Sequence, residues 1–388
     1  MRSRSLAVVL VTLSTFTDIV AYSIAIPVLP DIGRRLGASP TVIGLLFGSF
    51  GVTLLTVSMP MGAVSDRIGR RMPLAGGLIA LALASALFAF GDRLPWLFAA
   101  RLVQGAADAV TWVVGFALIA DLYGPEERGR VTGIVMSGTT FAVMIGPTIG
   151  GWLYEAGGAR LPFLAVAALA VIVAIGFLWL DVPAAHAPRD IVPVRDVLRT
   201  RSIVICAVVV VAASATISMT EPVLALHLSS LGVHPGRIGS VFGIGAVVST
   251  VMHPFFGRLA DRLGARRLTL FGLVAMAVNI LLLSQSWSFV STALLFCLAA
   301  AGAALVITPS LTFMGEATSE AGIGSFGVAY GIYNMAWGAG LLTGPSIGGF
   351  LYERLGFTWL ALGWSPALLL VTALLARVKS VRSPAAAT

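Results

Sequence analysis

Apolar segments long enough to cross a bilayer recur along the whole chain, and this recurrence limits the fold more than any other feature. A helix rises about 1.5 Å per residue, so roughly 20 apolar residues span a hydrocarbon core about 30 Å thick. Of the 388 residues, 58% are hydrophobic and only 11% are charged, whereas soluble domains carry about 25% charged residues. We therefore expect an all-α membrane protein without a separate soluble domain. Its twelve transmembrane helices are expected at about 6–29, 40–63, 72–91, 95–120, 131–154, 161–180, 202–228, 238–257, 268–286, 288–314, 325–351 and 357–376.

The two halves of the sequence repeat each other. The stretch PMGAVSDRIGRR (60–71) is echoed by FFGRLADRLGARR (255–267) at an offset of 195 residues, and GPTIGGWLYE (146–155) is echoed by GPSIGGFLYE (344–353) at an offset of 198. Six spans followed by six more is the plan of a secondary transporter whose site lies near the membrane midplane between the halves. We expect two six-helix pseudo-repeat bundles at 1–181 and 201–388, joined by a cytoplasmic linker at 182–200.

The basic residues are distributed unevenly over the loops. If both termini are cytoplasmic, eighteen Lys and Arg residues fall in the inner loops and tails and six in the outer loops. This positive-inside bias predicts the orientation, so the net charge of +8 needs no nucleic-acid partner. The basic start before the first apolar run also fits a signal peptide, but the length of that run favours an uncleaved span. Cys206 and Cys297 lie in apolar spans and indicate neither a disulfide nor a metal site.

Three motifs carry a resemblance to a known family. GAVSDRIGRR between the second and third spans, RLVQG in the fourth and GPTIGG in the fifth resemble the signature motifs of the major facilitator superfamily, specifically its drug:proton antiporter branch. DIVAYSIAIPVLP (18–30) and TEPVLAL (220–226) are similar to the vesicular monoamine transporters and their bacterial relatives. In that family a first-span Asp, nine residues before a Pro, receives the amine, and Asp18 and Pro27 stand in that relation. The chain departs from the family pattern at Phe50, Ala304 and Asn334, where the family has a Lys and two acids.

Two acids in the predicted spans have no counterpart in the other half. Asp18 aligns with Ala213 and Glu221 aligns with Ile26, so the repeat explains neither. An ionised side chain near the bilayer centre costs at least about 2.5 kcal/mol, so such residues are candidates for function. Because burial disfavours a charged carboxylate, a proton and an organic cation can compete for the same group. We therefore place the candidate exchange site at these acids.

Both acids also have structural interpretations. Asp18 can be a structural residue whose carboxylate is satisfied by the hydroxyls of Thr15, Thr17 or Tyr22, and Tyr22 can instead contact the substrate. Glu221 precedes Pro222, which favours a kink or break in the helix and an ion or substrate site beside it. The alternative is that Glu221 is solvated near the outer interface.

The fourth span carries a polar stripe. Arg101, Gln104, Gly105 and Asp108 are spaced i, i+3, i+4 and i+7 on one helical face, which must face protein or water. Arg101 is predicted to tune its partners or to form a structural pair, and Asp108 is a candidate proton carrier. Gln104 and Asn334 are candidates either for ligand hydrogen bonds or for ties between helices. An apolar pocket lining, or simple packing, is predicted for Phe16, Phe47, Phe50, Trp112 and Met144.

The repeated loop is predicted to act in gating. Charge pairs of its residues with Asp121 or Glu127 would hold the inner gate shut and break as it opens, which is also the role that the family resemblance implies. The alternative is that these charges only set topology. The predicted gating residues are Asp66, Arg67, Arg70, Arg71 and Asp121.

These features favour transport over other functions. No enzymatic nucleophile motif or metal-ligand cluster is present, and the only lysine, Lys379, follows Val378, so there is no phosphate-binding loop for an ATP-driven pump. We expect a proton-coupled antiporter that exports lipophilic, cationic small molecules such as drugs or amines. The alternative is a proton symporter or facilitator for a sugar or metabolite. The expected partners are a small-molecule substrate, protons and membrane lipid. We further expect a monomer without cofactor in a bacterial inner or plasma membrane.

Overall fold

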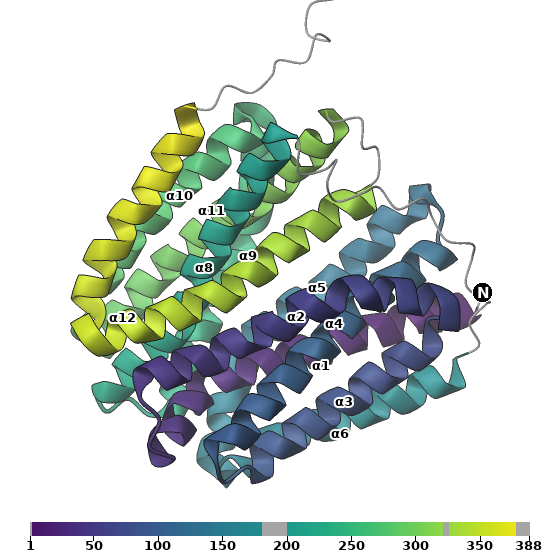
Figure 1. Ribbon diagram of the computed structural model, residues 1–388, viewed down its shortest axis with the longest axis horizontal. Coiled ribbons are helices and arrows are strands. Elements are labelled where there is room, and N and C mark those ends of the chain that lie inside the picture. Colours follow the sequence, from purple (N-terminus) through teal and green to yellow (C-terminus); the bar gives the residue numbers. More distant parts are fainter. Residues whose placement is uncertain (1, 181–199, 321–325, 378–388) are drawn as a thin grey trace, which may run out of the picture.

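The computed structural model describes residues 2–180, 200–320 and 326–377, and these residues form long helices joined by short turns (Figure 1). The predicted linker at 182–200 lies outside the described residues except for Thr200. The helices are α1 (Arg2–Arg35), α2 (Pro40–Ile68), α3 (Arg71–Phe90), α4 (Leu94–Leu122), α5 (Pro125–Gly157), α6 (Arg160–Trp179), α8 (Arg201–Ser230), α9 (Pro235–Leu263), α10 (Ala265–Leu283), α11 (Phe289–Glu320) and α12 (Phe326–Arg377).

Every one of the twelve predicted spans lies on a helix. In the described part of the chain, eleven helices are long and apolar enough to cross a membrane. The last of them, α12, contains two of the predicted spans, which meet at Gly356 with a φ of 76°. Only glycine adopts this left-handed conformation without a steric cost, so the chain reverses there between two helical arms. The chain is thus an integral membrane protein of helices.

Short turns with the same chemistry begin corresponding helices in the two halves. Pro40 and Pro235 occupy the first positions of α2 and α9, where the missing N–H of proline costs nothing. The turns before them pass through Gly37 and Gly232, which are 195 residues apart and have φ values of 76° and 78°. The sequence repeat is therefore also a repeat of local structure.

The helices of each half pack mainly against one another. In the first half α1 contacts α4, α5 and α6, and α3 contacts α4 and α6, while in the second half α12 packs on α8 and α11 packs on α9 and α10. Two extensive contacts join the halves, namely α2 with α12 and α5 with α9. Figure 1 shows α2 and the first arm of α12 running side by side, with α3 and α6 at one edge of the view and the yellow C-terminal arm of α12, next to α10, at the other.

Glycines bring the two halves into backbone contact. A Cβ atom added to Gly44 would lie 2.3 Å from the carbonyl oxygen of Pro345, and one added to Gly239 would lie 2.1 Å from that of Pro147. These two contacts are equivalent in the repeat. These glycines therefore permit close packing between helices of opposite halves.

Polar contacts reinforce the same side of the molecule, which we call the turn side because the α1–α2 turn at 36–39 lies there. The Glu353 carboxylate accepts hydrogen bonds from Ser39 Oγ at 2.7 Å and from the backbone N–H of Thr41 at 2.8 Å. The Glu155 carboxylate accepts one from the backbone N–H of Gly236 at 2.9 Å. Each glutamate thus caps the first turn of a helix in the opposite half, where N–H groups lack helical partners. The opposite side, with the loops at 69–70 and 264, is called the linker side.

Candidate functional site

Asp18 lies on α1 with its side chain fully enclosed by protein. Its exposed fraction is 1%, and its Oδ2 accepts a hydrogen bond from the Thr111 hydroxyl on α4 at 2.8 Å. The carboxyl group of Asp108, also on α4, is within hydrogen-bonding contact of the Asp18 carboxyl group. Two acids from different helices therefore meet at one place.

The neighbouring hydroxyls on α1 do not satisfy Asp18. Thr15 and Thr17 donate to backbone carbonyls one turn earlier, at Val11 and Leu13. The structural interpretation of Asp18 through these two threonines is therefore wrong, and Thr111 is the hydroxyl that sequence reasoning missed. Because 93 positions separate Asp18 from Thr111, no local pattern indicates this contact.

Glu221 on α8 is tied to the first half of the chain. The Tyr22 hydroxyl on α1 donates a hydrogen bond to Glu221 Oε2 at 2.7 Å. Glu221 is half-buried, so the alternative of a freely solvated acid is wrong. The helix α8 runs without interruption through Pro222, so of the expected kink or break the break is wrong. Glu221 therefore lies on a continuous helix, where the Tyr22 side chain of the other half holds its carboxylate.

Arg101 on α4 is fully buried among aromatic rings. Its guanidinium lies 4.7 Å from the ring centre of Phe47, 5.3 Å from that of Tyr22 and 5.7 Å from that of Phe88. Its NH1 donates to Gln104 Oε1 at 2.8 Å. Cation–π attraction strengthens as water is excluded, so these rings replace part of the hydration of the cation. Phe88 was not predicted, since only its position in space sets it apart from other apolar residues of α3.

The predicted polar stripe of α4 faces protein along its whole length. Arg101, Gln104, Gly105 and Asp108 are all buried. A Cβ on Gly105 would lie 2.2 Å from the carbonyl oxygen of Phe50, so α2 and α4 touch there. The helical spacing therefore correctly predicted a buried face, and glycine at 105 permits the contact.

The predicted pocket-lining side chains are spread over several contacts. Phe16 stacks on Phe141 with ring centres 6.2 Å apart, Phe50 lies 5.1 Å from Tyr22, and Trp112 lies 5.5 Å from Phe116. Met144 on α5 is partly buried. Asn334 on α12 is partly buried too, and no side-chain hydrogen bond joins it to the other described residues of the site. The structure thus brings together the residues on α1, α2, α4 and α8 but not Asn334.

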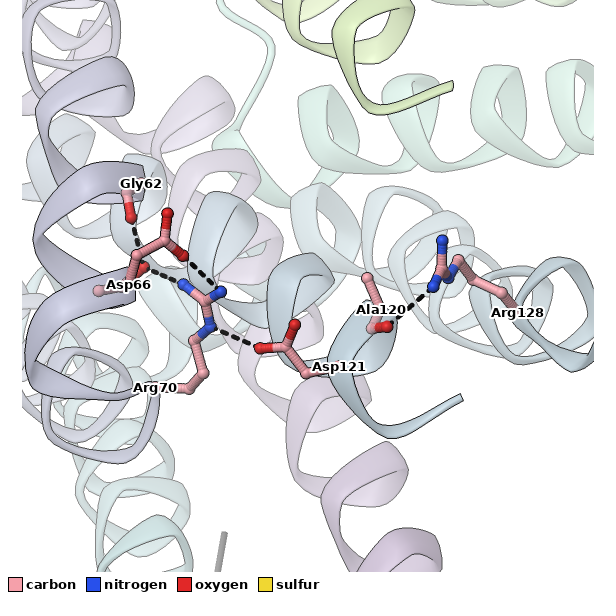
Figure 2. Close-up of polar contacts among 7 residues, drawn as sticks. Gly62, Asp66, Arg70, Ala120, Asp121 and Arg128 are labelled. Atoms are coloured by element: carbon pink, nitrogen blue, oxygen red, sulfur yellow. Dashed lines mark hydrogen bonds and ion pairs between the residues drawn. The ribbon is translucent and has the colours of Figure 1, made fainter. Parts of the chain in front are cut away.

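The predicted gating residues on the linker side divide into two groups. Arg70 is buried, and its guanidinium contacts Asp66 at 2.6 Å and Asp121 at 2.8 Å, so it joins the end of α2 to the end of α4 (Figure 2). It also donates to Ser65 at 2.5 Å. Arg67 and Arg71 are exposed and make no ion pair with the residues that the structure describes. All contacts of this network lie within the first half.

Comparison with known proteins agrees with this arrangement. The family model of the Major Facilitator Superfamily matches residues 11–220 and again residues 203–388. A probable vesicular acetylcholine transporter of Danio rerio is 29% identical over 95% of this chain and 80% of its own length. The synaptic vesicular amine transporter of Homo sapiens is 28% identical over 82% of this chain and 63% of its own length. The chain therefore spans less than two thirds of that amine transporter.

Solved structures share the fold at low sequence identity. A bacterial homologue of the human lysosomal transporter Spinster, in an inward-facing and occupied conformation, superposes with a TM-score of 0.79 at 16% identity, covering 97% of this chain and 95% of that one. The match of the family model over nearly the whole chain confirms the resemblance that the motifs predicted. The family is one of transporters rather than enzymes, and this chain belongs to the Major Facilitator Superfamily.

Proposed function

We propose that the chain is a secondary active transporter that exchanges protons for lipophilic, cationic small molecules such as drugs or amines. The observation that carries this proposal is that Glu221 of the second half bonds Tyr22 of the first half, and that Tyr22 also faces Asp108 and the buried cation Arg101. Asp18 on α1 lies against Asp108, and Glu221 on α8 bonds Tyr22, whose ring packs against Arg101. The similarity to vesicular amine and acetylcholine transporters supports a cationic substrate.

Alternating access requires two bodies that rock about a common site. The two units are residues 1–181 and 201–388, each a bundle of six helices, with 182–200 as a cytoplasmic linker. The two units meet through α2 with α12 and through α5 with α9. The Tyr22–Glu221 hydrogen bond crosses between them, so any rotation that separates α1 from α8 breaks it. A cation at Glu221 competes with Tyr22 for that carboxylate, which links binding to rotation.

The remaining assignments follow from this arrangement. Gln104 holds the Arg101 guanidinium, and Asn334 supplies a neutral hydrogen bond from α12 once the halves move. The apolar side chains Phe16, Phe47, Phe50, Trp112 and Met144 line the path of the lipophilic part. The network of Asp66, Arg70 and Asp121, with Arg67 and Arg71 beside it, gates the linker side. The protein acts as a monomer surrounded by lipid, with both termini cytoplasmic, in a bacterial inner or plasma membrane.

The test is transport by purified protein in liposomes of neutral and anionic phospholipid. Ethidium is the probe, because it is lipophilic and permanently cationic. An imposed pH gradient is expected to drive ethidium accumulation against its own gradient, and Glu221→Gln is expected to reduce the rate at least tenfold. Asp261→Asn, which alters an exposed acid on the linker side, is the control and should transport normally. Accumulation that persists when both Asp18 and Glu221 are neutralised would contradict the proposal, and transport that ignores the pH gradient would indicate a facilitator.

A further inference from the structure

The contact between Asp18 and Asp108 carries an inference about where the exchanged proton resides. The two side chains have exposed fractions of 1% and 7%, so neither carboxyl group reaches bulk water in this conformation. Thr111 donates to Asp18 Oδ2, and the Trp112 side chain hydrogen bonds to Asp108. Among the residues that the structure describes, no N–H or O–H group donates to Asp18 Oδ1. The pair is therefore short of donors.

A pair of buried carboxyl groups in this position needs a proton. An ionised carboxylate can only accept hydrogen bonds, so two ionised groups cannot bond each other. Two negative charges at contact distance in a medium of low dielectric constant also repel strongly. One proton between the two groups removes both costs, since the protonated carboxyl group donates to the ionised one. The contact is thus a geometry that one shared proton permits.

The surroundings supply few other charges to compensate the pair. Among the described residues, Tyr22 on α1 is the titratable group that faces Asp108, and Glu221 on α8 and Arg101 on α4 lie beyond it, against Tyr22 and each other. Arg101 is held by Gln104 and three aromatic rings. The central parts of the other helices that pack on α1 or α4 carry no titratable residue, namely 41–65 of α2, 72–90 of α3, 131–153 of α5, 161–179 of α6 and 238–252 of α9.

We propose that Asp18 and Asp108 share a single proton and that this proton, rather than one on Glu221, is exchanged for the cation. Glu221 accepts the Tyr22 O–H and faces Arg101, an arrangement that suits an acceptor rather than a second proton store. When the cation arrives, the O–H bond of the pair breaks and the proton leaves to water. The charge of the pair then changes from minus one to minus two, and the charge of the cation offsets the difference. This step rests on the proposed function, whereas the shared proton does not.

The shared proton is tested on the purified protein without any ligand. Infrared difference spectra of each variant against the parent at pH 7 are examined for the C=O stretching band of a protonated carboxyl group. Asp108→Asn is expected to remove one such band, because its amide N–H replaces the proton as donor to Asp18. Asp18→Asn is expected to remove the same band and serves as the second variant. Glu221→Gln and Asp261→Asn are expected to retain it. A band of the pair that survives both Asp108→Asn and Asp18→Asn would overturn the proposal.

The exchange is tested by proton release on addition of ethidium in weakly buffered detergent solution. We expect the parent to release about one proton per ethidium bound. Asp108→Asn should still bind ethidium but release at least fivefold fewer protons, whereas Asp261→Asn should release as many as the parent. Undiminished release from Asp108→Asn would overturn the assignment of the exchanged proton.

The two tests fail separately. If the infrared band depends on Asp108 but liposomes show no proton-driven transport, the shared proton stands and the proposed function falls. If transport is driven by protons but the band is indifferent to Asp108 and Asp18, the function stands and the pair does not hold the proton.

Discussion

The turn side and the linker side of the molecule differ in how far their contacts follow the sequence repeat. On the turn side several close contacts between the halves occur in pairs, because the repeat places Glu155 and Glu353 in equivalent positions and does the same for Gly44 and Gly239. Both copies of such a contact stabilise the association of the two halves, so that the loss of one leaves the other in place. The contacts on the turn side therefore stabilise the packing of one half against the other.

The linker side breaks the repeat at one residue. Asp66 is matched by Asp261, but Arg70 is matched by Ala265, so the buried guanidinium that joins α2 to α4 has no copy. Asp261 is exposed, whereas the neighbouring Arg266 donates to the backbone carbonyl of Leu375 at 3.0 Å. The two copies of the loop therefore fix different neighbours, since Arg70 ties α2 to α4 whereas Arg266 ties α10 to the end of α12.

The largest expected effect is that of Arg70→Ala. It removes one partner of a buried charge network and leaves Asp121 without its cation, so we expect a loss of about 3 kcal/mol in unfolding free energy. Asp261→Ala, in the copy of the loop, should change that free energy by less than about 0.5 kcal/mol. Thermal and denaturant unfolding in detergent measures both. Equal losses in the two variants would show that the loops are equivalent after all.

The next effect is that of Gly44→Ala. The added Cβ would lie 2.3 Å from the backbone oxygen of Pro345, so α2 and α12 must separate, at a cost of about 2 kcal/mol. Gly239→Ala should behave alike, since its contact is the copy. Labelling of a cysteine placed at position 346, where the Ser346 side chain already faces Gly48, should become faster in Gly44→Ala as the turn side loosens. Gly76→Ala, where a Cβ meets nothing within 4 Å, is the control, and a loss of stability there would contradict this account.

A smaller effect is expected for the capping glutamates. Glu353→Gln keeps an acceptor oxygen but removes the charge that favours the start of α2, so the turn side should open more readily. Glu155→Gln should act in the same direction on α9. Because the two caps are copies, the double variant should accelerate cysteine labelling at position 346 by more than either single variant. Equal labelling rates in the double variant and the parent would show that the two caps do not stabilise the closed turn side.

The smallest effect is expected for the exposed arginines of the loop. Arg67→Ala and Arg71→Ala remove solvated charges and should alter the unfolding free energy by less than about 0.5 kcal/mol. If either changed stability as much as Arg70→Ala, the division of the loop into a buried and an exposed group would be wrong. The same unfolding measurements decide this.

Sequence alone predicted the helices and the repeat because hydrocarbon thickness and spacing are constraints along one dimension. It also predicted that this face of α4 turns away from lipid, since the polar side chains of Arg101, Gln104 and Asp108 at helical spacing cannot face hydrocarbon. It did not predict that Thr111 satisfies Asp18 or that Phe88 covers Arg101, because these contacts join helices far apart in the chain. The continuity of α8 through Pro222 was missed as well, since within a membrane the free energy of exposing backbone groups outweighs the local preference of a residue before proline.

The three rings around Arg101 limit how a positively charged guest can be recognised. The faces of Phe47, Tyr22 and Phe88 already serve a resident guanidinium, so an aromatic cage for an incoming ammonium group cannot be built from them. Under the proposed function, discrimination between guests then falls to the carboxyl groups for charge and to the remaining apolar and aromatic lining for shape. A transporter of that kind is expected to accept many chemically unlike cations and to reject neutral molecules of the same outline.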